Sequence, residues 1–466
     1  MMKKLLIGVV VILLLILSYY YEDISKTLNT ANGFSAKNLC SAHYNSGYQF
    51  DDVMEQALLP VNPAFSLVSY EHDESSKTIH TSVAGLFSRQ AQYRPGLGCT
   101  LLGVEQEVLT GQITPVAQTV KSSSIPWPEG AGPVVKRDNL DYSVINKAID
   151  DAFAEPYPEG RRNTKAVLVI HQGELIAERY AAPISRQTPS LSWSMAKSVT
   201  NLLLGTLVHK GKLDIDKPAP VSDWQDENDP RSALTTDILL RMSSGLSFNE
   251  TYGINTDVSH MLSNVTSASN YAMSMPLAHE PDTHWSYSSG TTNILARILF
   301  DTIGGDLQDQ YDYAQSALFG PLGLDQAIME TDGSNVFIGS SYFYTTPGDW
   351  ARLGQFVLQD GVWKGERLLP EGWVDYSSTP TPVAPKREYG AQFWLNAKPP
   401  TDDLKSVWPS LPHDIFYMGG YQGQFVIISP SLGLVVVRLG YTSPGTDKGI
   451  EKLVAGIIKG ISSGQN

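Results

Sequence analysis

The chain has 466 residues, with 34 Lys and Arg against 48 Asp and Glu, which gives a formal net charge of −14 at pH 7. Hydrophobic residues make up 42% and charged residues only 18% of the chain, so it can bury a core and lacks the composition of a disordered protein. The acidic balance excludes nucleic acid as an expected partner, because such proteins neutralise phosphates with basic patches. The length allows about two or three domains.

The N-terminal segment over residues 1–21 has the layout of an export signal. Lys3 and Lys4 precede an apolar run over 5–17, as in a secretory signal peptide. Three tyrosines at 19–21 stand where small residues would mark a cleavage site, and aromatic residues suit a membrane interface. A cleaved signal peptide and an uncleaved anchor over 5–21 both remain open. In either case we expect an exported, periplasmic or otherwise extracytoplasmic protein that contacts the membrane only through this segment.

A small N-terminal α+β module is predicted over residues 38–120. The polar residues 22–37 before it are predicted to be a tether, and a linker rich in Pro and Gly follows over 121–139. Within the module we expect a short helix over 48–58. Two strands, over 66–71 and 78–86, are expected around a polar turn.

The two cysteines of the chain, Cys40 and Cys99, both lie in this module. In an oxidising compartment they pair most simply as one disulfide, with two separate buried thiols as the alternative. Two thiolates alone cannot complete a tetrahedral metal site. We therefore expect a disulfide and no metal here.

The remainder, 140–466, is predicted to be one α+β domain. Strand pairs are expected at both of its ends and helices between them, a pattern that predicts an antiparallel sheet flanked by helices and a helical region. The expected strand pairs cover 166–180 and 424–439, and helices are expected over 142–154, 194–209 and 447–461.

Ser194 and Lys197 are the first residues that could carry chemistry. Positions i and i+3 share one face of a helix, so the lysine amine can reach the serine hydroxyl. A serine becomes a nucleophile when a neighbouring base accepts its proton, and burial adapts a lysine to that role by lowering its pKa. The helix start also places the backbone N–H of Ser194 where it can face an oxyanion. An ordinary capped helix start is the alternative.

Tyr287, followed by Ser289, is a second candidate group, suited to a phenolic base or proton relay. Trp285 and Trp193 flank the two motifs and could line an apolar pocket or belong to the core. His279 and His284 are five residues apart with a proline between them, so they cannot share a helix face as metal ligands would. We expect no metal and no cofactor.

These motifs together resemble the serine β-lactamase and penicillin-recognising hydrolase superfamily. The sequence is most similar to its class C-like branch, with esterases and 6-aminohexanoate-dimer (nylon oligomer) hydrolases. The resemblance covers about residues 140–462, and its stretches occur in the family's order: Ser194-Met-Ala-Lys197, Leu239–Leu246, Phe248–Tyr252, Tyr287-Ser-Ser289, Thr346–Gly354 and Tyr389–Trp394. It implies a β-lactamase/transpeptidase-like fold.

The third family motif departs from the common pattern. The matching stretch is Met418–Gln424, with Met418 where many members carry a basic residue toward a substrate carboxylate. Gly420 would let a substrate approach the strand, and the resemblance implies that the N–H of Tyr421 is a second oxyanion donor. The implied function is an acyl-enzyme serine hydrolase of small esters or amides, in which either Lys197 or Tyr287 is the base.

Three other functions remain open from the sequence, one of which is that the N-terminal module does the main work by binding cell wall or a partner. Another is a D-alanyl-D-alanine carboxypeptidase or β-lactamase, against which Met418 argues. The third is a non-catalytic, membrane-tethered binding or sensor module, which would have no need of Ser194, Lys197 and Tyr287 together. The sequence does not indicate the oligomeric state.

Overall fold

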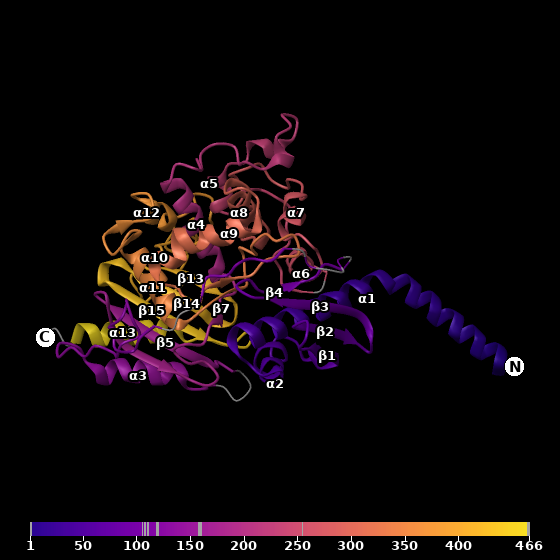
Figure 1. The fold of residues 1–466 in the computed structure, drawn as a ribbon, viewed down its shortest axis with the longest axis horizontal. Helices are drawn as coiled ribbons and strands as arrows, with labels where there is room; N and C mark the ends of the chain where they lie inside the picture. Colours follow the sequence, from indigo (N-terminus) through magenta and orange to yellow (C-terminus); the bar gives the residue numbers. More distant parts are fainter. Residues whose placement is uncertain are drawn as a thin grey trace.

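The computed structural model describes residues 2–463 apart from 105, 107–108, 110, 118–120, 157–160 and 254, and for 2–18 it describes the backbone alone. Its chain folds into a small N-terminal region and a larger body built on a central sheet (Figure 1).

The N-terminal region is one long helix packed on a four-stranded antiparallel sheet. The helix α1 (Met2–Ser46) leads into α2 (Phe50–Val53) and the π-helical turn η1 (Met54–Leu58). The sheet has the order β1-β2-β3-β4, with β1 (Val68–Asp73), β2 (Thr78–Val83), β3 (Leu86–Arg94) and β4 (Gly98–Leu101). The expected short helix and the first two strands are confirmed, whereas β3 and β4 were not predicted.

The prediction that residues 22–37 form a tether is wrong. They continue α1, and the polar side chains of Asn32, Ser35 and Lys37 are fully buried. Packing against the sheet supplies polar partners here: the Thr81 hydroxyl, for example, donates a hydrogen bond to the Asn32 carbonyl at 2.7 Å. A polar stretch can therefore be interior when a neighbouring element satisfies its hydrogen bonds.

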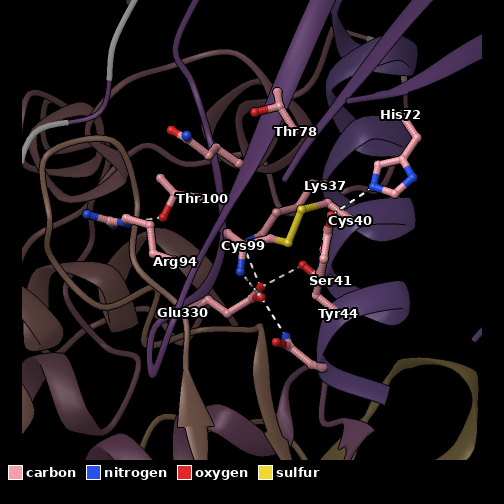
Figure 2. Close-up of a disulfide and its surroundings, with 12 residues drawn as sticks. Lys37, Cys40, Ser41, Tyr44, His72, Thr78, Arg94, Cys99, Thr100 and Glu330 are labelled. Carbon is pink, nitrogen blue, oxygen red and sulfur yellow. Dashed lines mark hydrogen bonds and ion pairs between the residues drawn. A yellow bond between two sulfur atoms is a disulfide. The ribbon is translucent and has the colours of Figure 1, made fainter. Parts of the chain in front are cut away.

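The disulfide between Cys40 and Cys99 is present and joins α1 to β4, with Cα atoms 6.0 Å apart (Figure 2). The pairing expected from the cysteine count is confirmed. It closes a loop with a sequence separation of 59 residues, which restricts the unfolded chain and so stabilises the folded module.

The body contains a six-stranded antiparallel sheet of order β12-β13-β14-β15-β5-β6. Its strands are β5 (Thr164–His171), β6 (Glu174–Tyr180), β12 (Trp394–Leu395), β13 (Phe416–Gly420), β14 (Gln424–Ser429) and β15 (Leu434–Gly440). Both predicted hairpins are confirmed, and β15 pairs with β5 to join the two ends of the domain. The sheet therefore pairs residues that lie between 263 (Leu434 and His171) and 276 (Gly440 and Thr164) positions apart in the chain.

Helices cover both faces of this sheet (Figure 1). On one face α3 (Tyr142–Phe153) and α13 (Ile450–Ser463) pack on the sheet through a shared apolar cluster. On the other face lie α4 (Met195–His209), α11 (Pro347–Leu358) and the helical region beyond them, including α8 (Ser289–Thr302) and α9 (Leu307–Ala314). The α+β layout expected from the sequence is confirmed.

Shorter elements complete the helical region and its connections. A three-stranded sheet of order β7-β9-β8 contains β7 (Ser190–Leu191), β8 (Ile328–Met329) and β9 (Phe343–Thr345), and β10 (Val362–Trp363) pairs with β11 (Glu366–Arg367). The short helices are α5 (Thr236–Leu240), α6 (Asp257–Ser263), α7 (Ala268–Met273), α10 (Gly320–Leu322) and α12 (Trp373–Ser378).

A buried ion pair connects the N-terminal region to the body. Lys37 Nζ of α1 lies 2.6 Å from Glu330, the residue after β8, and both side chains are fully buried. Ser41, Asn45 and the backbone N–H of Cys99 also donate hydrogen bonds to this carboxylate, at 2.6–2.9 Å (Figure 2). The N-terminal region is therefore anchored to the body by an interior polar contact.

No helix among the residues that the structure describes is both long and apolar enough to cross a bilayer. Most of the segment predicted as a signal peptide or anchor lies within residues 2–18, whose side chains are outside the described part. Export, and the choice between these two hypotheses, stay predictions.

Candidate active site

The start of α4 brings Ser194 and Lys197 together as predicted. Ser194 is the N-cap residue of the helix, and its side chain is partly exposed. Lys197 Nζ lies 3.2 Å from Ser194 Oγ, within hydrogen-bond distance. The helix N-terminus carries partial positive charge, which favours negative charge developing beside Ser194.

Lys197 is buried, with only 1% of its surface exposed. Its amine contacts the Ser289 hydroxyl at 3.0 Å and donates to the Ser340 carbonyl at 3.1 Å. Burial lowers the pKa of Lys197 from 10.5 to about 8, although the nearby carboxylate of Glu250 opposes the shift. About a tenth of this amine is therefore neutral at pH 7, a far larger fraction than for an exposed lysine, and can accept a proton.

Tyr287 also reaches this site. Lys197 Nζ lies 4.8 Å from the centroid of its ring, and a hydrogen bond with Ser194 is one of the influences on its pKa. Burial raises the pKa of Tyr287 well above its usual value, with the charge of Glu250 acting in the same direction and the Ser194 bond opposing it. The phenol is therefore held in its protonated form.

Ser289 lies deeper than expected for a substrate contact. Its side chain is fully buried at the first residue of α8, and its hydroxyl donates to Glu250 at 2.6 Å while contacting Lys197 at 3.0 Å. The hydroxyl thus connects the lysine to a carboxylate. The physical reason is its position at the buried start of α8.

Glu250 is a site residue that sequence reasoning missed. Its carboxylate accepts hydrogen bonds from both the backbone N–H and the hydroxyl of Ser289, at 2.7 and 2.6 Å. Burial raises its pKa, opposed by Lys197 and by the Ser289 hydrogen bonds. The helix N-terminus also stabilises this carboxylate. The signal in the sequence was present in the family-like stretch Phe248–Tyr252, to which no role had been given.

Gly420 ends β13, and Tyr421 follows it. A Cβ atom at Gly420 would collide with the carbonyl oxygen of Ser192, so the glycine is required for the strand to approach the segment that leads to Ser194. The Tyr421 ring packs edge-on against Trp193, with centroids 5.7 Å apart. The structure therefore brings this stretch to the site, as the resemblance implied.

Trp193 and Gln422, the residue after Tyr421, both have left-handed backbone conformations. Trp193 has φ of 47° and Gln422 has φ of 57°, a region that costs non-glycine residues about 1–2 kcal/mol. Their side chains are joined, since Trp193 Nε1 donates to Gln422 Oε1 at 3.0 Å. Arg438 supports the same turn by donating to the carbonyls of Gln422 and Gly423 at 3.3 and 2.7 Å. The local strain is thus held in place by specific hydrogen bonds.

The two tryptophans flanking the motifs belong to different aromatic groups. Trp193 is buried and packs with Tyr421 and Tyr342. Trp285 is partly exposed and contacts the rings of Tyr389 and Trp394 at 5.7 and 6.3 Å. Tyr287 belongs to this second group, with its ring 5.0 Å from that of Trp394.

Within the described part of the chain, no group of three or more His, Cys, Asp or Glu side chains could hold a metal ion. The rings of His279 and His284 stack on each other with centroids 4.0 Å apart, in a non-helical stretch.

The family model described as beta-lactamase matches residues 149–455. A curated relative, the 6-aminohexanoate-dimer hydrolase of Paenarthrobacter ureafaciens, is 27% identical over 249 residues, which cover 48% of this chain and 61% of the relative. The match thus spans less than two thirds of that relative's length.

Two solved structures show the same fold. A Bacillus anthracis protein provisionally named a 6-aminohexanoate-dimer hydrolase has a TM-score of 0.54 at 20% identity, covering 70% of this chain and 86% of its own. A family VIII carboxylesterase has a TM-score of 0.53 at 12% identity, covering 70% and 98%. Identities this low establish the fold alone, and the expected β-lactamase/transpeptidase-like fold is confirmed.

Proposed function

Because the chain belongs to the beta-lactamase family of serine hydrolases, we propose that it cleaves a small ester or amide through a covalent acyl-enzyme on Ser194. The observation that carries this proposal is the contact of 3.2 Å between Ser194 Oγ and the buried amine of Lys197. A hydroxyl held against a base of lowered pKa is the arrangement that nucleophilic catalysis requires.

In the first step, Ser194 Oγ attacks the substrate carbonyl while its proton passes to the neighbouring base. The lowered pKa of Lys197, about 8, suits proton acceptance, because a general base works best with a pKa near the operating pH. Tyr287 is protonated before the reaction and is assigned the proton delivery to the leaving group, after which the proton taken up by Lys197 passes to the phenolate and restores both groups. The two groups interact closely, so their protons leave in steps that belong to the pair.

The oxyanion is assigned to two backbone donors, the N–H groups of Ser194 and Tyr421. Ser194 stands at the N-terminus of α4, and the approach of Gly420 to Ser192 holds the neighbouring Tyr421 close to it. In other hydrolases the loss of one such donor costs about 3–4 kcal/mol of transition-state stabilisation. Water then attacks the acyl-enzyme, releases the acid and returns the proton to Ser194.

The substrate class is assigned from the third motif and from the relatives. Met418 on β13 is fully buried in the core, so the position that is basic in many family members supplies no charge to a substrate carboxylate. The named relatives include a 6-aminohexanoate-dimer hydrolase and a carboxylesterase. Both support an ester or linear amide over a penicillin-type substrate.

The test is hydrolysis of a panel of p-nitrophenyl esters, short amides and nitrocefin, with fluorophosphonate labelling of the active serine. We expect ester or amide turnover and a single labelled site, both lost in Ser194→Ala. The matched control is Ser198→Ala, since Ser198 lies on the same helix but donates to the Gln392 carbonyl at 2.7 Å. Labelling that persists in Ser194→Ala would refute the nucleophile, and turnover of nitrocefin alone would refute the substrate class.

A further inference from the structure

The N-terminal region lies outside the residues that match the family model, 149–455, yet it reaches the active site. The ring of Phe34 on α1 stacks on Trp193, with centroids 6.1 Å apart and planes inclined by 11°. Phe65, on the 3-10 turn η2 (Pro63–Leu67), stacks in turn on Phe34 at 5.5 Å. Trp193 contacts Tyr421 on its other side. These four residues form a continuous aromatic row, and its member Trp193 directly precedes Ser194 in the chain.

Three of the four members of the aromatic row are partly exposed to solvent. Phe34, Phe65 and Tyr421 are partly exposed, as is Ser194 itself, whereas Trp193 is 7% exposed. Tyr252 stacks on Tyr421 at 6.1 Å. Apolar surface left partly exposed next to a nucleophile is available to bind the apolar part of a substrate.

The N-terminal region is positioned against the site by hydrogen bonds as well as by ring contacts. Gln422 Nε2 donates to the carbonyl of Ala57 in η1 at 3.1 Å, while its Oε1 accepts from Trp193. The same amide side chain thus links the N-terminal region, the residue before the nucleophile and the turn after Tyr421. The aromatic row therefore has a fixed position relative to Ser194.

The chemistry assigned to Tyr287 decides which part of the substrate faces the row. A leaving group must lie next to its proton donor, and Tyr287 belongs to the other aromatic group, with Tyr389 and Trp394. The acyl part of the substrate is therefore assigned to the aromatic row of Phe65, Phe34, Trp193 and Tyr421.

We propose that this aromatic row binds an apolar acyl chain, so that the N-terminal region sets the acyl specificity of the hydrolase. The proposal rests on the proposed function. It gives a role to a region that the family model does not include. Phe34 and Phe65 are its specificity-determining residues, because they extend the row away from the catalytic groups.

The experiment measures kcat/KM for p-nitrophenyl acetate, butyrate and octanoate. It compares the unmodified full chain with a full chain that lacks the phenyl rings of Phe34 and Phe65. In the double variant Phe34→Ala/Phe65→Ala we expect kcat/KM for octanoate to fall at least about tenfold, because the binding of each buried methylene contributes to transition-state stabilisation. The value for acetate should change less than about twofold, since its acyl group is too short to reach the row.

Two further variants separate binding from folding. Leu86→Ala removes an apolar side chain that is 59% exposed on the same region but outside the row, and it should leave all three esters unchanged. Phe34→Leu/Phe65→Leu keeps apolar volume and should recover part of the octanoate activity. Thermal melting of each variant reports whether the fold is intact.

Each outcome decides the proposal. An equal loss of kcat/KM for all three esters, with or without a lower melting temperature, would refute the aromatic row as an acyl-binding site and leave it with a structural role. Unchanged octanoate hydrolysis would overturn it as well. Absence of ester or amide turnover that depends on Ser194 in the unmodified protein would instead refute the proposed function, and the inference with it.

Discussion

Lys37 and Lys197 are two of the buried lysines of this protein, and their surroundings differ. Lys37, in the joint between the N-terminal region and the body, contacts the carboxylate of Glu330 directly at 2.6 Å. Lys197, in the active site, contacts two hydroxyls and a carbonyl, and the carboxylate of Glu250 lies one hydroxyl further away. The difference lies in whether a carboxylate contacts the amine itself.

At Lys37 the contact with Glu330 opposes the effect of burial on the amine. Burial lowers its pKa, and Glu330 opposes that shift through both its charge and its hydrogen bond. The amine also donates to the Cys99 carbonyl and lies 4.5 Å from the ring centroid of Tyr342. Such a pair holds the N-terminal region and the body together, since removing one partner leaves the other charge uncompensated.

At Lys197 the amine is left able to lose its proton. Within the described part of the chain it has no carboxylate at ion-pair distance, and burial brings its pKa to about 8. The Ser289 hydroxyl transmits the influence of Glu250 without direct contact. We therefore propose that the nearest partner distinguishes the two lysines, with Lys37 a structural cation and Lys197 a base.

The largest expected effect comes from Lys197→Met. Loss of the base should reduce kcat/KM by about 10³- to 10⁴-fold, the upper part of the range for general acid–base catalysis. The free energy of unfolding should not fall, because the variant removes a buried amine without leaving a carboxylate in contact with it. Ester hydrolysis and urea unfolding of the purified variant measure both. Activity within tenfold of the unmodified protein would refute the role of Lys197.

Lys37→Met should lower stability and leave activity unchanged, which is the reverse of Lys197→Met. It leaves the carboxylate of Glu330 buried without a cation, which costs about 3–5 kcal/mol of stability, while the folded fraction keeps its kcat. Urea unfolding and active-site titration separate the two quantities.

Two controls accompany Lys37→Met. One changes another lysine of α1, and the other also changes Glu330, the partner of Lys37. Lys26→Met removes an exposed ion pair with Glu22, and we expect no measurable change in stability. Adding Glu330→Gln to Lys37→Met should restore part of the lost stability, because the amide is neutral and still accepts hydrogen bonds. A stable Lys37→Met variant would show that the joint does not depend on the pair.

The smallest effect is expected from Glu250→Gln, and it concerns pH. In the unmodified protein kcat/KM should rise through about pH 8 as Lys197 loses its proton. Glu250 raises the pKa of Lys197. Without its negative charge the protonated amine is less favoured, so this rising limb of the kcat/KM profile should move to lower pH. The measurement is kcat/KM from pH 6 to 10.

Asp301→Asn is the matched control for that prediction. Asp301 lies at the other end of α8, is exposed and pairs with Arg297. The neutral residue there should leave the pH profile where it is. A shift of the limb to higher pH in Glu250→Gln would contradict the electrostatic argument.

The sequence alone predicted much of the local structure and of the site. Hydrophobic periodicity with turn residues predicted the hairpins and the terminal helices of the body. The spacing of Ser194 and Lys197 on one helix predicted their contact, because three residues make about one turn. The cysteine count predicted the disulfide. Each of these inferences depends on residues close in the chain or on a single choice of partner.

The tertiary structure decided what depends on residues far apart in the chain. The polar stretch before Lys37 became a buried helix because β2 and Glu330 supply its partners. Glu250 became a site residue because α8 begins beside it. Phe34 and Phe65 reached Trp193 because α1 and η2 pack on the body. Burial and partner distance set the pKa of a lysine, and both are properties of the assembled fold, which no local pattern contains.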